Sequence, residues 1–540
     1  MTRAPNRLAV IGCGSSGLIC LKTALDKLPG WEVVCFEKSA QITGCWGNPY
    51  PGFVSTSTKY TTQFACFSER DASVESDVDH SRSEFYRGAE YGQYLNRFAD
   101  AFQLHPHIKL GHQVERLARA ADNAGWSVTY RATDSAPPPV TEYFDAVVIC
   151  TGLAAQIKEI ESEVPAIRLS QVNTSEGIAN IRNERIVVFG GGESAVDLAV
   201  RLSQPDLGNA VYLSLRTGVR VSPRYHPIRG VPSDFLRNRL MLSLHPALRN
   251  WIGQRFVEAR ILHQERFERW FPSTARNKLG GNELKIPQQR KEWAYKLTKA
   301  AKDELFNMFH NKSDDFLDHV AQGHIKIVGP PVTSRMDTFY QFQSEQTVEV
   351  HPTKILPAIG YRSTLQTIAG DSIRLADFYL GCCHNTFPNL FLVGFARPII
   401  GNIPTISEMQ SAYVCGLIGG RYARPERIVE LNAADQRAHA ARFSKVDLEA
   451  VYPVEMFSYC DRLSRLMDTY PSVRSLGSIL AWWRMQLSPA TTMHYFYRDP
   501  HIRSFSERAP VYMPTLLVLF LLVLKPLDWT YRSCQWLRGR

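Results

Sequence analysis

The chain has 540 residues, of which 44% are hydrophobic and 21% are charged, an ordinary composition for a globular protein of two or three structural units. This composition excludes a disordered chain, a collagen-like chain and a polytopic membrane protein. The 62 Lys and Arg residues outnumber the 52 Asp and Glu residues, and the formal net charge of +10 favours an anionic partner: a phosphorylated cofactor, nucleic acid or an acidic membrane surface. The 11 Cys residues include no C-x-x-C pair, which argues against a disulfide framework and favours a reducing compartment.

The first predicted unit is a βαβ fold around a glycine-rich loop. An apolar strand over residues 7–11 begins so early that no signal peptide fits before it, so we expect a cytosolic domain. Gly12-Cys13-Gly14-Ser15-Ser16-Gly17 follows, then a helix over 18–28 and a strand over 32–36 that ends at Glu37. The glycines permit a tight turn, the approach of a pyrophosphate and close helix packing, and Glu37 can accept hydrogen bonds from ribose hydroxyls. The pattern predicts a dinucleotide site.

A second glycine loop follows a strand over residues 185–189. It reads Gly190-Gly191-Gly192-Glu193-Ser194-Ala195 and precedes a helix from Val196 and a strand over 210–214. Arg216, rather than a carboxylate, follows that strand. A guanidinium there can bind the adenosine 2′-phosphate of NADPH, although a lone Arg is otherwise an ordinary surface charge. We therefore predict that this unit prefers NADPH to NADH.

Two dinucleotide-binding folds imply two dinucleotides, and the simplest chemistry that joins them is hydride transfer from a nicotinamide to a flavin. The chain is therefore predicted to be an oxidoreductase. Disulfide reductases with two such folds pass electrons to a close cysteine pair, but the chain offers only the vicinal Cys382-Cys383. Thiol chemistry is accordingly disfavoured.

Further motifs along residues 7–425 resemble those of the flavin-containing monooxygenases. They are Ile-Thr-Gly-Cys-Trp at 42–46, Val-Ser-Thr-Ser-Thr-Lys at 54–59, Val-Val-Ile-Cys-Thr-Gly at 147–152, and the segments 214–222, 355–361 and 401–410. The resemblance implies a class B flavoprotein monooxygenase. In that family NADPH reduces a tightly held FAD, O2 adds to give a flavin hydroperoxide that NADP⁺ shields from water, and one oxygen atom passes to a soft nitrogen or sulfur nucleophile of a small lipophilic substrate.

The resemblance also implies residue roles. FAD would be held by Gly12, Cys13, Gly14, Ser15, Ser16, Gly17, Glu37, Gly44, Cys45, Trp46 and Gly152. Thr56 and Ser57 would lie between the flavin and the nicotinamide. NADPH would be held by Gly190, Gly192, Ser194, Ala195 and Asp197, with Arg216 on the 2′-phosphate.

Three departures from the family pattern concern the oxygenation step. The signature F-x-G-x-x-x-H is absent ahead of the second loop, Thr43 replaces the first glycine of Gly-Gly-x-Trp, and Thr56 stands where the family usually has Asn. Thr56 would then support the hydroperoxide through its hydroxyl, and Asn402 could supply an amide, although Asn beside Gly and near Pro is usually turn chemistry. We predict Thr56 and Asn402 as the catalytic residues.

Other activities remain alternatives. The same oxygenated flavin in its deprotonated form attacks ketones in a Baeyer–Villiger reaction. An intermediate left unprotected would make the protein an NADPH oxidase or flavin reductase that releases hydrogen peroxide, and a chain that has lost turnover would be a scaffold retaining FAD. No metal site is predicted, and no nucleic-acid motif is present.

The predicted fold is α/β, with two Rossmann-type domains and a helical extension. Residues 1–165 and 330–440 form the FAD domain, and residues 166–329 form an inserted NADPH domain, with Pro330-Pro331 marking the return. Within the insertion, the segment 235–271 alternates Arg with apolar residues in a helical pattern that favours packing on the NADPH domain over membrane contact.

Residues 441–540 form the helical extension, and residues 421–540 carry +6 of the net charge of +10. Their apolar segment 511–524 is short for a spanning helix and is followed by Trp529, Tyr531 and Trp536 with Arg532. It predicts a membrane-associating segment, either a short transmembrane anchor or a monotopic insertion, with a buried C-terminal helix as the alternative. The expected location is a membrane surface with the catalytic domains facing the cytoplasm, that of the endoplasmic reticulum in a eukaryote.

Overall fold

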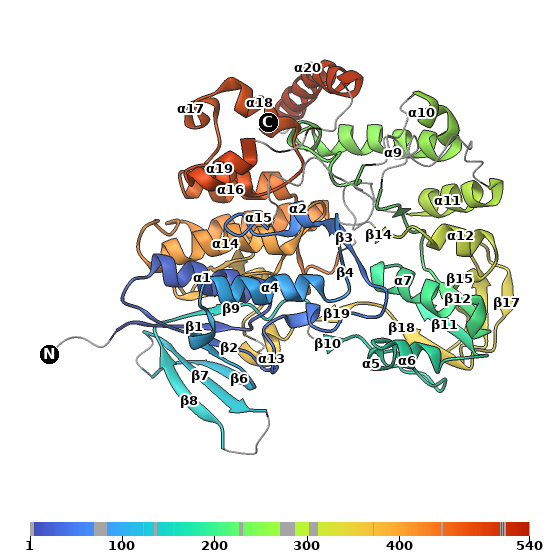
Figure 1. Ribbon diagram of the computed structural model, residues 1–540, viewed down its shortest axis with the longest axis horizontal. Helices are drawn as coiled ribbons and strands as arrows, with labels where there is room; N and C mark the ends of the chain where they lie inside the picture. Colours follow the sequence, from blue (N-terminus) through green and yellow to red (C-terminus); the bar gives the residue numbers. More distant parts are fainter. Residues whose placement is uncertain are drawn as a thin grey trace.

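The computed structural model describes residues 5–69, 84–121, 124–133, 138–154, 156–225, 231–270, 287–301, 311–370, 372–443, 446–507, 509, 511 and 515–538. Two α/β units lie side by side, and a layer of helices covers one edge of both (Figure 1). The mixed α/β architecture with two glycine-loop units is as predicted.

The first unit is built on a seven-stranded sheet in the order β20-β21-β22-β9-β1-β2-β5. Its strands are β1 (Arg7–Ile11), β2 (Glu32–Phe36), β5 (Ile108–Lys109), β9 (Ala146–Ile149), β20 (Phe378–Tyr379), β21 (Cys383–His384) and β22 (Leu390–Leu392). The central strand β1 pairs in parallel with β2 and β9. Helices α1 (Ser15–Lys27) and α14 (Ile403–Ile418) pack closely on each other beside this sheet. Because both faces of the sheet are covered, β1 is buried and reads as a continuous apolar run.

The second unit is built on a six-stranded sheet in the order β17-β16-β15-β12-β11-β18. Its strands are β11 (Arg185–Phe189), β12 (Ala210–Ser214), β15 (Ile325–Pro331), β16 (Thr338–Gln341), β17 (Thr347–Glu349) and β18 (Lys354–Pro357). Helix α7 (Glu193–Leu202) connects β11 to its parallel neighbour β12. This is the second predicted βαβ unit.

The predicted return to the first unit at residue 330 is wrong. Pro330 and Pro331 lie at the end of β15, and the chain continues through β16, β17 and β18 within the second sheet. β18 pairs in parallel with β11, on the side away from β12. The return to the first sheet therefore comes after Pro357. A Pro at the end of a strand is compatible with the ladder, so the pair did not signal a boundary.

Smaller elements complete the first unit. A separate antiparallel sheet contains β6 (His112–Arg119), β7 (Trp126–Ala132) and β8 (Val140–Phe144). Strand β3 (Val54–Thr58) pairs with β4 (Phe85–Arg87), and the short helix α2 (Lys59–Thr62) and helix α4 (Glu90–Ala101) follow them. Strand β23 (Ala396–Pro398) pairs with β24 (Tyr452–Val454) from the C-terminal extension.

The covering layer joins the insertion to the C-terminal extension. The insertion supplies α8 (Arg239–Leu242), α9 (Pro246–Leu262), α10 (Gln264–Trp270) and α11 (Gln288–Ala300), so the segment 235–271 is helical where it is described. The extension supplies α16 (Met456–Leu466), α17 (Val473–Leu476), α18 (Ile479–Leu487), α19 (Pro500–Glu507) and α20 (Thr515–Arg538), and α15 (Ile428–Arg442) precedes it.

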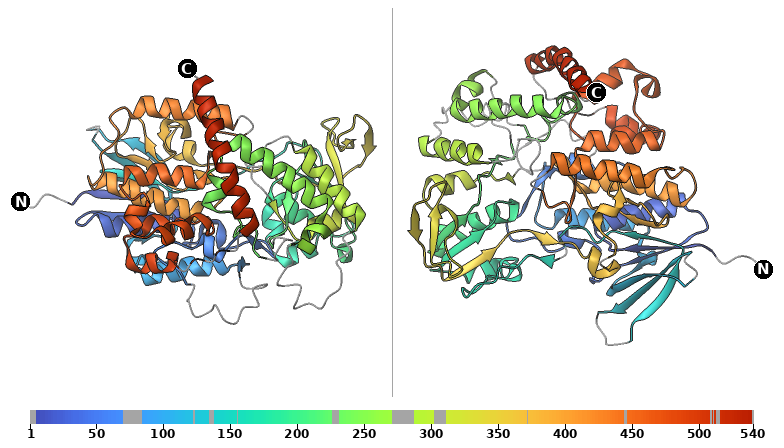
Figure 2. Two further views of the ribbon diagram at one scale, coloured as in Figure 1. Left: turned by 90° about the horizontal axis from the view of Figure 1, so that it is seen from above. Right: turned by 180° about the vertical axis from the view of Figure 1, so that it is seen from behind.

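The apolar C-terminal segment forms the start of α20, although residues 512–514 of the predicted range lie outside the described residues. Figure 2 shows α20 running across the outer surface of the helical layer. Leu521 and Leu524 pack against Leu240 and Leu244 of the insertion. Among the helices of the described ranges, none combines the length and apolarity needed to cross a bilayer. A transmembrane helix is therefore not supported, because α20 carries Lys525, Pro526 and Asp528 midway along its length.

Candidate functional site

The first glycine loop has the geometry of a phosphate cradle. Gly12 adopts φ +96°, and a Cβ added there would lie 2.9 Å from the carbonyl oxygen of Cys150. A Cβ at Gly17 would lie 1.9 Å from the carbonyl oxygen of Gly12. Gly14 precedes the first residue of α1, and no side chain caps the start of that helix. The free N–H groups and the positive end of the helix dipole therefore face the loop, as a pyrophosphate site requires.

Two predicted FAD residues make hydrogen bonds within the protein. Glu37 is 6% exposed, and its carboxylate accepts hydrogen bonds from the N–H of Cys13 at 2.7 Å and from that of Ser39 at 2.9 Å. The carboxylate therefore stands at the end of β2 beside the glycine loop. The Ser16 hydroxyl lies 2.9 Å from that of Ser407 on α14. Ser16 thus joins α1 to α14 and has less freedom to bind a phosphate than the backbone N–H groups.

The remaining predicted flavin neighbours lie around the same loop. Gly44 and Cys45 begin a short 3-10 helix that ends at Trp46, and a Cβ at Gly44 would lie 3.1 Å from the Cα of Gly14. Trp46 packs edge-on against Tyr91, with ring centroids 5.1 Å apart. Gly152 follows β9 with φ +73° and open space where its Cβ would be. These segments leave room for a flat ligand beside the first loop.

The second loop shows a similar division between tight and open glycines. Gly190 adopts φ +122°, and a Cβ there would lie 2.3 Å from the carbonyl oxygen of Ala358. Gly192 adopts φ −85° and has no atom within 4 Å of its Cβ position. The protein itself therefore has space for a side chain there, and a ligand bound at the loop would occupy that space. Ser194 lies in the first turn of α7, and the buried Ala195 packs in the core of the unit.

Asp197 and Arg216 have different surroundings. Tyr50 of the first unit donates a hydrogen bond to Asp197 Oδ2 at 2.5 Å, so Asp197 connects the two units. Burial raises the pKa of Asp197, and the hydrogen bond from Tyr50 opposes that rise. Arg216 is exposed just beyond the end of β12, with no hydrogen bond or ion pair to another side chain within the described ranges. Its guanidinium is therefore available to an external anion.

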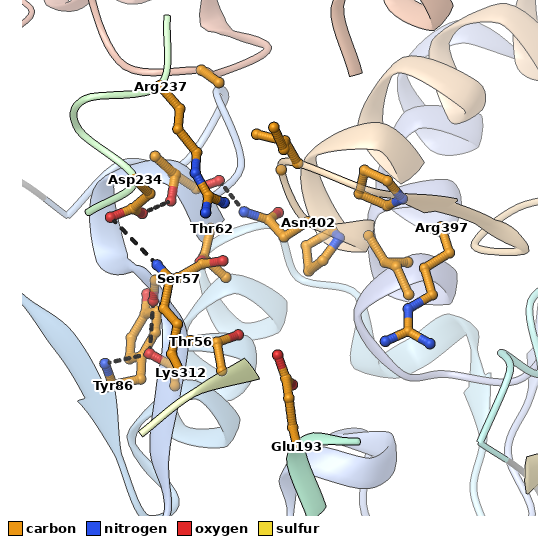
Figure 3. A pocket seen from close by; sticks show the side chains of 18 of the residues that line it. Thr56, Ser57, Thr62, Tyr86, Glu193, Asp234, Arg237, Lys312, Arg397 and Asn402 are labelled. Carbon is orange, nitrogen blue, oxygen red and sulfur yellow. Dashed lines mark hydrogen bonds and ion pairs between the residues drawn. The ribbon is translucent and has the colours of Figure 1, made fainter. Parts of the chain in front are cut away.

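A cavity of about 220 Å³ lies where the two units and the helical layer meet (Figure 3). Its walls come from Trp46, from β3 and α2, from the start of α7, from the segment 234–237, from Lys312, from the segment 397–404 and from Ala490. It contains four predicted site residues: Trp46, Thr56, Ser57 and Asn402. Because residues of both glycine-loop units line one space, a group bound to the first unit can meet a group bound to the second.

The two predicted catalytic residues both lie on the cavity wall but differ in how far their side chains are already hydrogen-bonded. Thr56 is half-buried on β3, and within the described ranges its hydroxyl has no hydrogen-bond partner. Asn402 is the N-cap of α14: its Oδ1 accepts from the N–H of Thr405 at 3.3 Å, and its Nδ2 donates to the carbonyl of Thr61. Much of the hydrogen-bonding capacity of Asn402 is thus used in capping, the turn chemistry that its neighbours Gly401 and Pro404 indicate.

Charged side chains that were not predicted as site residues also line the cavity. They are Asp234 and Arg237 from the insertion, Lys312 from β14 (Asn311–Lys312), Glu193 at the start of α7 and Arg397 on β23 (Figure 3). Burial lowers the pKa of Lys312 to about 8, against the opposing attraction of Asp234. Burial raises the pKa of Glu193, although Arg397 opposes the rise. No local pattern predicts that these residues share one cavity, since they come together only through the fold.

The residues present fit a bound flavin nucleotide. The uncapped start of α1 and the carboxylate of Glu37 suit the pyrophosphate and ribose of FAD. Within the described ranges, the buried Thr62 Oγ1 has no hydrogen-bond partner, and Thr62 lines the cavity. Orphaned buried polar atoms of this kind are rare without a ligand or water. The site therefore suits a polar ring system beside Trp46 and Thr56.

Comparisons with known proteins agree with this geometry. Residues 5–285 match the family described as flavin-binding monooxygenase-like. The 4-hydroxybenzoate brominase (decarboxylating) of Marinomonas mediterranea is 24% identical over 93% of this chain and 92% of its own length. Flavin-containing monooxygenase 5 of Rattus norvegicus is 25% identical over 92% of this chain and 90% of its own length.

Solved structures share the fold. A closed crystal structure of cyclohexanone monooxygenase superposes with a TM-score of 0.58 at 18% identity, covering 86% of this chain and 98% of that one. At this identity the likeness concerns the fold alone.

Proposed function

The chain belongs to the flavin-binding monooxygenase-like family, and we propose that it transfers one oxygen atom from O2 to a nitrogen or sulfur nucleophile of a small molecule. It is an NADPH- and FAD-dependent monooxygenase, an oxidoreductase. The observation that carries the proposal is the single cavity lined by β3 of the first unit and by the start of α7 of the second. A nicotinamide held at the second loop and a flavin held at the first would both reach it.

FAD supplies the redox chemistry when bound: it accepts a hydride from NADPH and, once reduced, activates O2. The protein positions the groups and excludes water. In the proposal, the start of α1 binds the FAD pyrophosphate, Arg216 binds the NADPH 2′-phosphate, and Trp46 with Tyr91 closes one wall of the cavity. The hydroxyl of Thr56 donates a hydrogen bond to the reacting oxygen, and Asn402 holds α14 and Thr61 in place through its cap.

A coupling assay tests this activity. The holoenzyme is given NADPH with methyl phenyl sulfide, N,N-dimethylaniline or cyclohexanone, and NADPH use, peroxide release and product are measured together. Oxygenation of the sulfide or amine in step with NADPH use is expected. An ester from cyclohexanone with no product from the other two would instead indicate Baeyer–Villiger chemistry, and peroxide equal to NADPH with all three would indicate an oxidase.

Thr56 offers a sharper test of the same proposal. Thr56→Val removes the hydroxyl at nearly constant volume, and Thr56→Ser retains it. We expect Thr56→Val to divert NADPH to peroxide, since loss of one positioned donor costs about 10²-fold in such sites, while Thr56→Ser stays coupled. Equal coupling in the two variants would remove Thr56 from the reaction.

We also propose that the molecule attaches to the cytoplasmic surface of a membrane through α20, without spanning it. The outer face of α20 exposes Leu519 (53%), Val523 (69%), Leu527 (58%) and Trp529 (79%), while Leu521 and Leu524 are buried beneath it. Exposed apolar residues beside Arg532 suit insertion among anionic headgroups. Figure 1 places α20 at the edge of the molecule opposite the three-stranded sheet β6-β7-β8.

Flotation with vesicles of phosphatidylcholine and phosphatidylserine tests the attachment. The double change Leu519→Lys and Val523→Lys alters only exposed positions, and we expect it to abolish binding without lowering the melting temperature. The matched control Val140→Lys changes a 47% exposed residue on β8 and should leave binding intact. Undiminished flotation of the double variant would contradict attachment through α20.

A further inference from the structure

Cations outnumber carboxylates around the cavity. Arg237, Lys312 and Arg397 face it with Asp234 and Glu193. Burial raises the pKa of Glu193, which reduces its negative charge near neutral pH. A partly desolvated site with surplus positive charge is unfavourable until an anion enters it.

Asp234 is already engaged. Its Oδ2 accepts hydrogen bonds from the N–H of Thr58 at 2.9 Å, from the Thr58 hydroxyl at 2.9 Å and from the Thr61 hydroxyl at 2.8 Å. Its Oδ1 lies 4.0 Å from Lys312 Nζ. Asp234 therefore fixes β3 and α2 and offsets the charge of Lys312. No carboxylate of the described part of the chain is then paired with Arg237.

Arg237 is half-buried on the cavity wall and lacks a partner among the described residues. Across the described ranges, no side-chain hydrogen bond or ion pair reaches its guanidinium. Burial lowers its pKa, opposed only by the attraction of Asp234. A planar guanidinium in this condition is suited to a carboxylate, which can accept two parallel hydrogen bonds.

The backbone of Arg237 is held in place before any ligand binds. Its carbonyl accepts from the N–H of Ala490 at 3.0 Å, and its own N–H donates to the carbonyl of Asp234 at 3.1 Å. The next residue, Asn238, caps α8 by accepting from the N–H of Met241 at 3.0 Å. Contacts from both sides fix the position from which the guanidinium extends, and such preorganisation lowers the cost of binding.

We propose that the substrate carries a carboxylate and that Arg237 binds it, with Lys312 as the second cation. The apolar part of the substrate would lie along Pro398, Ile399 and Ile400, which line the same cavity. Figure 3 shows Arg237 entering across the cavity from Glu193, the residue that follows the second glycine loop, so the carboxylate subsite is separate from the nicotinamide side. This inference rests on the proposed oxygenation, whose substrate class it narrows.

Binding to the oxidised FAD-holoenzyme tests the inference directly. The probes are 4-(methylthio)benzoate and its neutral isostere 4-(methylthio)benzamide, and dissociation constants are measured by calorimetry in the presence of NADP⁺. We expect the benzoate to bind about tenfold to hundredfold more tightly, the usual range for hydrogen bonds to a charged group. Arg237→Leu should lose this preference while keeping the affinity for the amide, and Arg237→Gln, the milder variant, should lose most of it. Arg474→Leu, a change on exposed α17, serves as the matched control.

The outcomes separate this inference from the proposed function. Equal affinity of the wild type for the two probes would overturn the carboxylate subsite, even if both sulfides are oxygenated. If the benzoate binds much more tightly than the amide but peroxide is the sole product, the carboxylate subsite is supported and the proposed oxygenation is wrong. If Arg237→Leu and Arg237→Gln weaken NADP⁺ as much as the benzoate, Arg237 binds the cofactor and the inference is wrong.

Discussion

At the scale of single residues, Gly190 and Gly192 stand two positions apart in one loop and are required for different reasons. Gly190 has a left-handed φ and touches the carbonyl of Ala358 across the sheet, so the folded protein itself needs a glycine there. Gly192 has an ordinary φ and open space. Gly192 is also the N-cap of α7, where glycine is a favoured residue, and we expect a bound pyrophosphate to be the second reason for a glycine there.

Alanine at each position should therefore give opposite results. Gly190→Ala is expected to lower the free energy of unfolding by roughly 2–4 kcal/mol, from backbone strain and overpacking. Gly192→Ala should lower that free energy by no more than about 1 kcal/mol, the usual contribution of an N-cap residue, and weaken NADP⁺. Chemical denaturation and calorimetric titration measure the two effects. A loss of stability in Gly192→Ala with unchanged NADP⁺ affinity would contradict the assignment of the second loop.

Arg216 carries the predicted preference for NADPH. Its exposed guanidinium follows β12, at the position where the 2′-phosphate is expected. We expect Arg216→Ala to raise the KM for NADPH about tenfold to hundredfold, the range for a charge-assisted contact, and to spare NADH. Arg335→Ala, on an exposed loop of the same unit, is the matched control. Equal effects on NADPH and NADH would rule out the phosphate contact.

At the scale of elements, β21 ends in a histidine that the fold keeps neutral. His384 is 3% exposed, and its Nδ1 accepts hydrogen bonds from the N–H groups of Thr386 and Phe387, both at 3.0 Å. Burial lowers the pKa of His384 to about 4, and Arg424 adds to the effect while Asp377 opposes it. Protonation would destroy both acceptor contacts, so this edge of the first sheet depends on neutral His384.

The pH dependence of stability follows from that pKa. Below the unfolded value of 6.5 the unfolded chain gains a proton that folded His384 does not, so its contribution to stability is present at neutral pH and is lost as pH falls from 6.5 to about 4. The loss amounts to about 3 kcal/mol, at about 1.4 kcal/mol per pH unit. His384→Asn offers an acceptor that does not titrate. Its unfolding free energy should fall less over this interval, and parallel pH profiles for both proteins would refute the assignment.

At the scale of the whole molecule, residues 50–52 of the first unit form hydrogen bonds to α7 of the second. Tyr50 bonds Asp197, and Arg201 donates to the carbonyl of Gly52 at 2.5 Å. Asp197, predicted to serve the cofactor loop, thus also holds the units together. The stretch 50–52 therefore bonds directly to the helix that follows the second glycine loop.

Tyr50→Phe isolates that contact. The change leaves the half-buried Asp197 carboxylate without its donor, and we expect a loss of about 1–3 kcal/mol. Because burial already raises the pKa of Asp197, the loss should be larger at neutral pH, where the carboxylate is charged, than in mild acid. Tyr340→Phe, on β16, is the control. Identical unfolding curves for wild type and Tyr50→Phe would show that the contact does not stabilise the assembly of the units.

Local patterns allowed both glycine-loop units to be predicted, because the strand, loop and helix of each are contiguous in the chain. The extent of the second sheet was missed, because the pairing of β18 with β11 joins residues far apart in sequence. Arg237 and Lys312 were not predicted as site residues for the same reason. Arg237 was assigned to the Arg-rich helical segment 235–271, and an isolated Lys carries no motif. The N-cap at Asn402 shows the converse, a local signal whose ordinary meaning holds in the structure.

The backbone hydrogen bond from Ala490 to Arg237 joins the C-terminal extension to the insertion. The residues proposed to bind the cofactors lie in loops at the ends of strands of the two sheets. Arg237, the residue proposed to bind the substrate, lies in the insertion, and its backbone is held by Ala490 of the C-terminal extension. Selectivity and redox chemistry are therefore encoded in separable stretches. If residues 231–242 and 488–496 are both replaced by those of a relative, we expect the substrate preference to change to that of the relative. Replacement of only one of the two segments should disturb the contact between Ala490 and Arg237.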